Sequence, residues 1–266
     1  MADLIGRRIL VVGASSGVGK ACATAFVHAG AAVAFAARRV DLLAGAVDEA
    51  NAAGPGVAHA LALDVTNTDS IADSVTAAAT TMGGLDGVLY TAGMSPIARL
   101  STVTPEQWHT ILAINTVGPS MVFAAALKHI SPDGIMAAIS SDSSHQPRHS
   151  LVPYAASKAA LEATMEGWRT EEIGGLRFMT VMIGPTGPSG FADNFSPDEF
   201  MGLIPHWQRQ GFRTGMQTSD DVGNHLASAF ASLFDAPLLG IETLLLRAPE
   251  PALAVADFGG SEVFGS

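Results

Sequence analysis

The sequence predicts an α/β fold in which helices cover both faces of a parallel sheet. Apolar runs of four to eight residues alternate with longer stretches of helical periodicity, a pattern typical of successive βαβ units. The runs are apolar throughout, as expected of strands that are buried on both faces. No internal repeat, linker or shift of composition divides the chain. We therefore expect a single domain over residues 1–266.

The first half of the chain supplies four predicted strands and the helices between them. The strands cover residues 8–13, 32–37, 57–63 and 85–91, and the helices cover residues 17–28, 41–52 and 67–82. Asp41 is expected to be the N-cap of the second helix, because its carboxylate can accept from a free backbone N–H. A long helix is expected from Thr104-Pro105, since Thr is a good cap and Pro is favoured at the first helical position.

The second half continues the alternation with one interruption. It holds predicted strands at 134–140, 176–183 and 241–246, a helix at 153–173, and a helix from a cap at Ser219-Asp220-Asp221 to about residue 234. Residues 187–217 form a Gly/Pro-rich segment too long for an ordinary connection, and we interpret it as a substrate lid. Its apolar side chains would roof a pocket. They are Phe191, Phe195, Phe200, Met201, Leu203, Ile204, Trp207, Phe212 and Met216. Residues 247–266 are expected to form a C-terminal tail.

The composition is that of an acidic, apolar chain. It has 14 Lys+Arg against 25 Asp+Glu, a formal net charge of −11, and 48% hydrophobic residues. With no basic cluster larger than Arg7-Arg8 or Arg38-Arg39, nucleic acid is not an expected partner. No uninterrupted apolar run reaches the roughly 18 residues of a membrane span, so no membrane is expected either. The single cysteine, Cys22, allows no intrachain disulfide and is expected to be a buried thiol. The expected location is the cytoplasm.

The first predicted strand and helix are joined by a loop with the spacing G-x-x-x-G-x-G, at Gly13, Gly17 and Gly19. Glycine lets the backbone N–H groups at a helix N-terminus approach a pyrophosphate closely. A phosphoryl-transfer loop is disfavoured, because Ala14 stands where its first glycine would be and Ala21 where its Ser or Thr would be. The loop predicts dinucleotide binding.

The end of the second predicted strand distinguishes between two dinucleotides. A site for NAD places an acid there to hold the ribose 2′-OH, whereas a 2′-phosphate requires a cation. Ala37 occupies this position and is followed by Arg38 and Arg39, whose guanidinium groups can bind phosphate in a bidentate manner. NADP(H) is therefore favoured as the cofactor, with NAD(H) as the alternative.

Four polar residues form the candidate catalytic set, Asn115, Ser141, Tyr154 and Lys158. Tyr154 and Lys158 are four residues apart in a predicted helix and therefore share one face. Ser141 ends the fifth strand, at the sheet edge where ligands of open α/β sheets bind, and Asn115 lies inside a helix. Hydride transfer to a carbonyl builds negative charge on its oxygen, which requires a positioned proton donor. A nearby Lys158 ammonium would lower the pKa of Tyr154 toward neutrality.

With these motifs the chain resembles the short-chain dehydrogenase/reductase family over residues 5–246. The resemblance is carried by the glycine loop, Leu63-Asp64-Val65, Thr91-Ala92-Gly93, Asn115, Ser141, the Tyr154/Lys158 pair and Gly184-Pro185-Thr186. It implies a single Rossmann-type, doubly wound domain with a sheet of seven parallel strands. It also implies an NAD(P)-dependent reaction at CH–OH groups and an Asn-Ser-Tyr-Lys catalytic set.

The resemblance further implies a role for each matched residue. Tyr154 would be the acid/base, Ser141 would steady the substrate oxygen, and Lys158 would hold the nicotinamide ribose. Asn115 would hold a water that feeds protons to Lys158. The expected cofactor-binding residues are Gly13, Ser15, Ser16, Gly17, Val18, Gly19, Arg38, Arg39, Asp64 and Val65 (at the adenine), Ala92 and Gly93 (at the adenosine ribose), Tyr154, Lys158, Gly184 and Thr186 (at the carboxamide). The expected substrate contacts are Ser141, His145 and Tyr154.

The chain also departs from the pattern of the family it resembles. Tyr90 and Thr91 stand where the family often has two asparagines, and Ile183 stands where proline is usual. After the last strand, Arg247 begins a segment that replaces the common Gly-Gly turn. His145 lies between Ser141 and Tyr154, as does His149, but no third ligand stands at metal spacing, so no metal is expected.

Two functions are compatible with these motifs. The favoured one is an NADP(H)-dependent oxidoreductase that interconverts a carbonyl and a secondary alcohol on a fairly apolar small molecule. The alternative is a non-catalytic NADP(H)-binding sensor or partner-binding protein, which would be expected to lack Tyr154 or Lys158. Arg209 and Arg213 are further candidates for holding an acidic group. Since family members commonly form tetramers, and residues 117–127 and 161–168 offer apolar surface, a homo-oligomer (tetramer or dimer) is expected.

Overall fold

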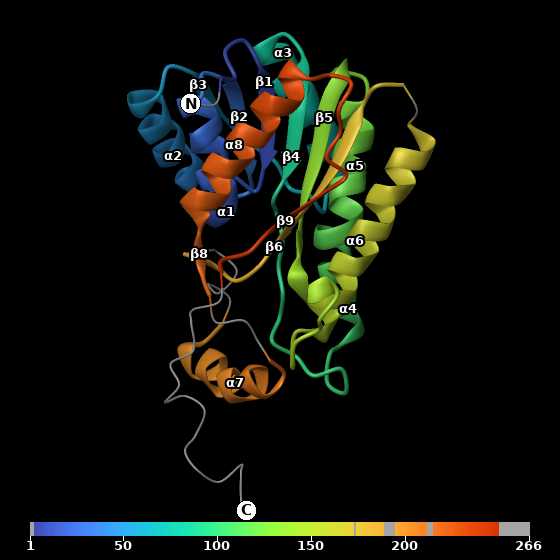
Figure 1. The fold of residues 1–266 in the computed structure, drawn as a ribbon. Coiled ribbons are helices and arrows are strands. Elements are labelled where there is room, and N and C mark those ends of the chain that lie inside the picture. The colour runs from blue at the N-terminus through green and yellow to red at the C-terminus, as the bar shows by residue number, and fades with distance from the viewer. Residues whose placement is uncertain (1–2, 173, 189–194, 212–214, 250–266) are drawn as a thin grey trace, which may run out of the picture.

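The computed structural model describes residues 3–172, 174–188, 195–211 and 215–249. A seven-stranded sheet with the order β3-β2-β1-β4-β5-β6-β9 forms its centre, and every neighbouring pair is parallel (Figure 1). The strands are β1 (Arg8–Val12), β2 (Ala32–Ala37), β3 (Val57–Ala62), β4 (Leu85–Tyr90), β5 (Ile130–Ser141), β6 (Arg177–Ile183) and β9 (Thr243–Leu246). The α/β fold and parallel sheet predicted from the sequence are confirmed.

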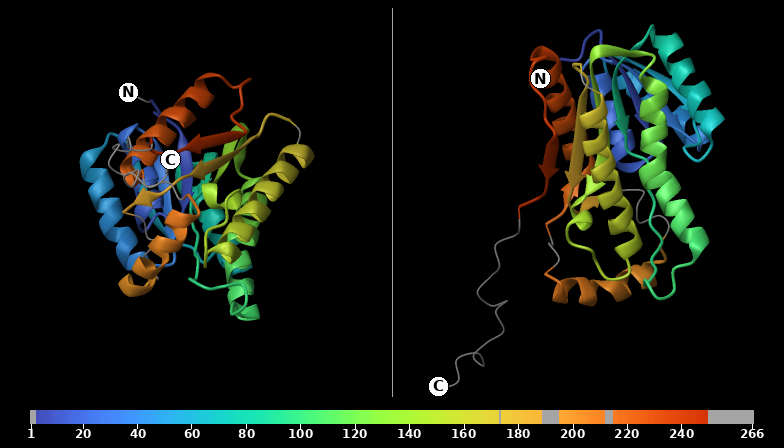
Figure 2. Two further views of the ribbon diagram at one scale, coloured as in Figure 1. Left: turned by 60° about the horizontal axis from the view of Figure 1, so that its bottom comes forward. Right: turned by 90° about the vertical axis from the view of Figure 1, so that its right-hand side faces the viewer.

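Helices cover the sheet on both faces, each over its own apolar core (Figures 1 and 2). One face carries α1 (Gly17–His28), α2 (Val40–Ala53) and α8 (Ser219–Asp235). The other carries α3 (Thr68–Met82), α5 (Gly118–Ala126) and α6 (Val152–Glu171). The inner strands are buried on both sides because their side chains alternate between the two cores, whereas the edge strands β3 and β9 are partly exposed.

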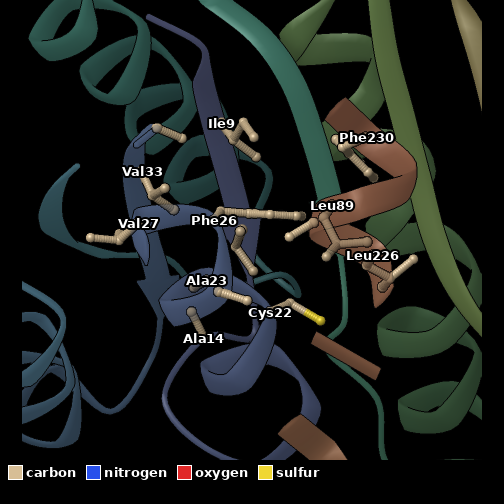
Figure 3. Packing of buried hydrophobic residues seen from close by; sticks show 14 of the residues in the cluster. Ile9, Ala14, Cys22, Ala23, Phe26, Val27, Val33, Leu89, Leu226 and Phe230 are labelled. Atoms are coloured by element: carbon tan, nitrogen blue, oxygen red, sulfur yellow. The ribbon is translucent and has the colours of Figure 1, made fainter. Parts of the chain in front are cut away.

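The contact between α1 and α8 shows how the first of these cores is filled. The rings of Phe26 and Phe230 lie with their centres 5.0 Å apart, and Cys22 and Leu226 lie nearby in the same cluster (Figure 3). Cys22 is fully buried, and burial raises the pKa of its thiol to about 12. The prediction of a buried thiol is therefore confirmed.

Helix caps explain where several elements begin. Thr104 and Gln107 form a capping box at the start of α4 (Pro105–Leu112), as the Thr-Pro pair predicts. Two predicted caps are wrong. Asp41 lies inside the first turn of α2, which follows Arg39 without a side-chain cap. Helix α8 is capped by Thr218 rather than Ser219, because the Thr218 hydroxyl accepts from the backbone N–H of Asp221.

The predicted lid is not a continuous loop. Helix α7 (Pro197–Arg209) lies beneath the carboxyl edge of the sheet, at the bottom of Figure 1 and of the right-hand view of Figure 2. The two-residue strands β7 (Thr186–Gly187) and β8 (Gln217–Thr218) pair in parallel at the two ends of this segment. Phe195, Leu203 and Trp207 pack with Leu151 in a small separate cluster. Phe191 and Phe212, also predicted for the lid, lie outside the described residues, as does most of the predicted tail.

One helical run, Pro105–Ala126, is long and apolar enough to cross a membrane by length and composition, and 39% of its window is buried. It comprises α4, a π-helical turn at Ala113–Val117 and α5. Core helices pass the same test, and one face of this run packs against the sheet and α3. The run therefore carries no argument for a membrane.

Candidate active site

The candidate site lies at the carboxyl edge of the sheet, where the strand order reverses between β1 and β4. Ligands of open α/β sheets bind at such a switch point. Gly13 and Gly17 there have φ of +92° and +53°, a region that glycine tolerates best. A Cβ at Gly19 would lie 2.2 Å from the carbonyl oxygen of Gly13 and 2.4 Å from the Oγ1 of Thr91. The loop is therefore packed so closely that only glycine fits at position 19.

Arg39 crosses from the end of β2 to the glycine loop. Its Nη2 donates to Oγ of Ser15 at 3.2 Å and to Oγ of Ser16 at 2.8 Å. Neither serine carries a charge, so Arg39 brings a cation to the loop that the sequence of the loop itself lacks. Arg38, the neighbouring exposed residue, contributes to the lowered pKa of Asp64. Both arginines and Ala37 thus lie where the sequence predicts a 2′-phosphate site.

The other predicted cofactor residues follow the strand ends along the same edge. Asp64 and Val65 come after β3, and hydrogen bonds from the backbone and side chain of Thr66 are the main cause of the lowered pKa of Asp64. Ala92 and Gly93 come after β4. A Cβ at Gly93 would meet only Asn115 Oδ1 and Lys158 Nζ, each at 3.6 Å, so the space beside Gly93 leads to the candidate catalytic residues.

Tyr154 lies in the first turn of α6, hydrogen-bonded to Ser141 at the end of β5. Burial raises the pKa of Tyr154 to about 12, against the opposing effects of Ser141 and of the Arg148 cation. At neutral pH the phenol therefore holds its proton. The expectation that Lys158 lowers this pKa is not met, because the lysine Nζ donates to the Ile139 carbonyl at 2.7 Å and lies 5.9 Å from the centre of the Tyr154 ring.

Lys158 is itself buried, and its burial lowers the pKa of its ammonium to about 8. Glu162, one turn further along α6, opposes this shift. The Glu162 carboxylate also accepts from Ser140 and Ser144, and it pairs with His145 Nε2 at 2.9 Å. The side chain of His145, predicted as a substrate contact, is 66% exposed and is directed toward Glu162 of α6.

Asn115 lies in the π-helical turn, fully buried. Its Nδ2 donates to the Met94 carbonyl and to Ser157 Oγ, each at 2.9 Å, and its Oδ1 accepts from Met94 N–H. Both side-chain N–H donors are therefore used within the protein. Through these bonds Asn115 ties the segment after β4 to α6. The Tyr90 hydroxyl donates to the Ile114 carbonyl at 2.6 Å, next to this turn.

A buried ion pair that the sequence does not predict stands beside Ser141. Arg148 Nη2 lies 3.0 Å from both carboxylate oxygens of Asp142, and its Nη1 donates to Ser143 Oγ. Arg247 approaches Asp142 at 3.7 Å, and its side chain packs on Gly184. The position of Arg148 between Ser141 and Tyr154 is the only sequence signal for this pair. The two members of the pair act in opposite directions on the pKa of Tyr154, which Arg148 lowers and Asp142 raises.

Thr186, the last predicted cofactor residue, stands in β7 after β6. Its Oγ1 donates to the Gly184 carbonyl at 2.9 Å and accepts from Gln217 Nε2 at 3.0 Å. Gln217, which the sequence did not indicate, also donates to the Leu246 carbonyl, so it links Thr186 to the end of β9. In the described part of the chain, no group of three or more His, Cys, Asp or Glu side chains is placed to hold a metal ion.

Comparisons with known proteins agree with this geometry. The sequence model of the short chain dehydrogenase family matches residues 7–199. The chain is 33% identical to glycine betaine reductase ATRR of Emericella nidulans over 186 residues, which are 69% of this chain but 15% of that protein. It is 25% identical over 260 residues to the uncharacterized oxidoreductase YvrD of Bacillus subtilis, covering 90% of this chain and 96% of that one.

Solved structures give the same relationship. The crystal structure of a metagenomic short-chain oxidoreductase in complex with NADP is similar with a TM-score of 0.73 and 26% identity. The match covers 92% of this chain and 98% of that one. The shared fold therefore includes the last strands of the sheet, beyond the residues that the family model matches.

Proposed function

The chain belongs to the short-chain dehydrogenase family and is an NAD(P)-dependent oxidoreductase acting on CH–OH groups, and from that premise we propose that Tyr154 is its proton donor and NADP(H) its cofactor. The observation that carries the proposal is the Tyr154–Ser141 hydrogen bond, with buried Lys158 one turn further along the same helix. The substrate is a small-molecule carbonyl or secondary alcohol.

Tyr154 and Ser141 perform the proton step in this proposal. The raised pKa of Tyr154 keeps the phenol protonated at neutral pH, so it is ready to donate to a carbonyl oxygen as that oxygen becomes negative. Ser141 Oγ binds the same oxygen and orients it toward the phenol. In the direction of alcohol oxidation, Tyr154 must first lose its proton, and the Arg148 cation favours that form.

Lys158 and Asn115 support the step in different ways. Lys158, with its pKa lowered to about 8, can exchange a proton with its surroundings near neutral pH, which suits a residue that returns protons to Tyr154. Asn115 acts as a positioning residue, because its amide holds Met94 and Ser157 together across the site.

The residues present fit a bound NADP(H), which supplies or accepts the hydride. Gly13, Gly17 and Gly19 carry no side chain that would keep a pyrophosphate away from the backbone of the loop. Arg39, held by Ser15 and Ser16, and Arg38 provide the cations that a 2′-phosphate needs. The NADP complex of the metagenomic relative supports the same choice, and NAD(H) is the alternative cofactor.

The experiment that tests the proposal is turnover of a panel of ketones with NADPH by the wild type and by Tyr154→Phe. The variant keeps the ring and loses the proton, so kcat should fall by about a hundredfold or more, while the Kd of NADPH stays within a factor of about two. A variant that keeps more than about a tenth of the wild-type kcat contradicts the role of Tyr154. NADPH binding without turnover of any carbonyl by the wild type would instead favour a non-catalytic sensor.

A further inference from the structure

A cavity of about 240 Å³ lies beside the first turn of α6, and none of the catalytic residues is in its lining. Its wall includes Arg99, His149, Ser150, Val152 and Gln210. These residues come from three segments: the loop after β4, the loop before α6 and the C-terminal end of α7. Val152 is the first residue of α6, so the cavity borders the helical turn that carries Tyr154.

Hydrogen bonds fix the walls of this cavity to one another. The backbone N–H of His149 donates to Gln210 Oε1 at 2.9 Å, and Trp207 Nε1 donates to the His149 carbonyl at 2.9 Å. The backbone N–H of Ala98 donates to the Ser150 carbonyl at 3.0 Å. The polar groups around the cavity are therefore held in place, which is how binding sites limit the entropy cost of ordering a ligand.

Positive charge gathers at the cavity. Arg99 is the charged residue of its lining, and Arg209, which precedes the lining residue Gln210, has its Nη2 3.1 Å from His206 Nδ1. The His206 ring stacks on His149 with ring centres 4.2 Å apart. Among the described residues, neither Arg99 nor Arg209 pairs with a carboxylate, although the whole chain has 25 Asp+Glu against 14 Lys+Arg.

The pKa of His206 is lowered by burial and by the same positive charges. Burial lowers it, and so do His149, Arg209 and Arg99, while no carboxylate opposes them. Arg209 and His206 stand in the last turn of α7, where cations also complement the helix dipole. That structural role does not account for Arg99, which reaches the cavity from a different loop.

We propose that this cavity binds an anionic oxygen group, a carboxylate or a phosphate, at the end of the substrate remote from the reacting carbonyl. The assignment to the substrate rests on the proposed function. Guanidinium groups bind such anions through paired N–H donors, and the Ser150 and Gln210 side of the wall adds neutral polar groups. The volume holds one such group with several waters, since a water occupies about 30 Å³ of liquid volume. The proposal extends the interpretation of Arg209 from the sequence; Arg213 lies outside the described residues.

Direct binding tests the anion site without any turnover. Succinate and inorganic phosphate are titrated calorimetrically into the protein, with and without saturating NADP⁺, because NADP⁺ occupies the other cationic site at Arg38 and Arg39. We expect at least one anion to bind, and Arg99→Gln and Arg209→Gln each to weaken it about tenfold. Lys128→Gln removes the same charge from an exposed position between α5 and β5 and should change the Kd less than about twofold. Binding that is absent up to about 10 mM, or unchanged in both arginine variants, overturns the proposal.

Kinetics then test whether the anion belongs to the substrate. A keto acid with a terminal carboxylate is compared with the methyl ketone of the same chain length, using NADPH. We expect Arg99→Gln to lower kcat/KM about tenfold for the keto acid and to leave it unchanged for the ketone. Equal losses for both substrates, or a keto acid that the wild type uses no better than the ketone, overturn the assignment to substrate. Failure to oxidise NADPH with any carbonyl would contradict the proposed function while the calorimetric result stands.

Discussion

Lys158 is buried inside the protein, yet the proposed reaction uses its ammonium group. Burial lowers its pKa from the usual 10.5 to about 8, so the unfolded chain binds more protons than the folded chain between these values. The free energy of unfolding therefore rises with pH across that window, and below about pH 8 the buried charge costs stability in full.

This cost predicts that Lys158→Met stabilises the fold while it abolishes turnover. Methionine fills similar space without a charge, so the free energy of unfolding at pH 7 should rise by about 1–2 kcal/mol, less than the full shift because the hydrogen bond to the Ile139 carbonyl is lost. The gain should shrink by pH 10. Urea denaturation at both pH values measures it, with the exposed Lys128→Met as the control. If Lys158→Met is no more stable than the wild type at pH 7, burial of the ammonium does not lower the free energy of unfolding.

Arg39 and Arg38 give a prediction for the choice of cofactor. Hydrogen bonds to Ser15 and Ser16 hold the Arg39 guanidinium at the glycine loop. The positive charge of Arg38 is partly offset by the Asp64 carboxylate, whose pKa it lowers. Replacing Arg39 by Ala should therefore weaken NADPH about tenfold, Arg38→Ala somewhat less, and neither should change the affinity for NADH. Fluorescence titration of the wild type and both variants with both cofactors measures the six dissociation constants. A wild type that binds NADH as tightly as NADPH refutes the predicted preference for NADP(H).

At the scale of single elements, the π-helical turn shows what the sequence does not reveal. Two buried residues from elsewhere bond to this turn: the Tyr90 hydroxyl donates to the Ile114 carbonyl, and Ser157 Oγ accepts from the side-chain amide of Asn115. A Cβ at Gly118 would lie 2.5 Å from the Tyr90 hydroxyl, so the glycine leaves room for this contact. No local pattern encodes such distant partners, and the sequence accordingly predicts a plain helix around Asn115.

Tyr90→Phe tests whether this turn positions the site. Loss of the hydroxyl leaves the buried Ile114 carbonyl without its donor, which should lower the free energy of unfolding by about 1–3 kcal/mol and lower kcat several-fold as Asn115 shifts. Ser131→Ala is the matched control, because its hydroxyl bonds Leu85 and Asp86 at the opposite edge of the sheet. The control should lose stability and keep kcat. A Tyr90→Phe variant with the kcat of the wild type would give the turn a structural role alone.

The start of helix α7 is marked in the sequence by a capping pattern. The irregular spacing of the apolar residues around it obscures this pattern. Ser196, Pro197 and Glu199 repeat the capping pattern that correctly located the start of α4. The side chains of Ser196 and Glu199 form the capping box observed at the start of α7. A short helix with such a cap inside a long loop can be predicted from the sequence. Where that helix docks depends on contacts such as Trp207 to the His149 carbonyl, which the sequence does not specify.

At the scale of the whole molecule, regular periodicity made the sheet predictable. The helix Gly17–His28 and the strand Ala32–Ala37 begin and end where the sequence places them, because apolar runs and glycines bound them on both sides. Tyr154, Lys158 and Ser141 are brought together as the parallel topology requires, since strand ends meet at one edge. The Arg148–Asp142 pair and the cavity beside Arg99 depend on how loops fold over that edge. Loop packing of this kind leaves no periodic pattern in the sequence, so the sequence does not predict it.

The outer faces of the long helices bear on the predicted assembly. Residues 161–168 do not offer the expected apolar surface, because Leu161 and Met165 are buried in the core. The exposed side of α6 instead carries small residues, Ala156, Ala159 and Ala163. On the neighbouring run Val117 is 51% exposed and Met121 38% exposed. Small and apolar residues together let helices of two chains approach closely, so we still expect a homodimer or homotetramer.

Light scattering tests this assembly, with an expected mass of two or four times 27.3 kDa. Met121→Glu places a charge in the predicted interface, and because removing a charge from water is costly it should shift the protein toward smaller species. Met201→Glu is the matched control. Met201 lies on α7 and is 65% exposed, so a charge there should leave the mass unchanged. A wild-type mass of 27.3 kDa at micromolar concentration contradicts the assembly. If Met201→Glu lowers the mass and Met121→Glu does not, the interface lies on α7 instead.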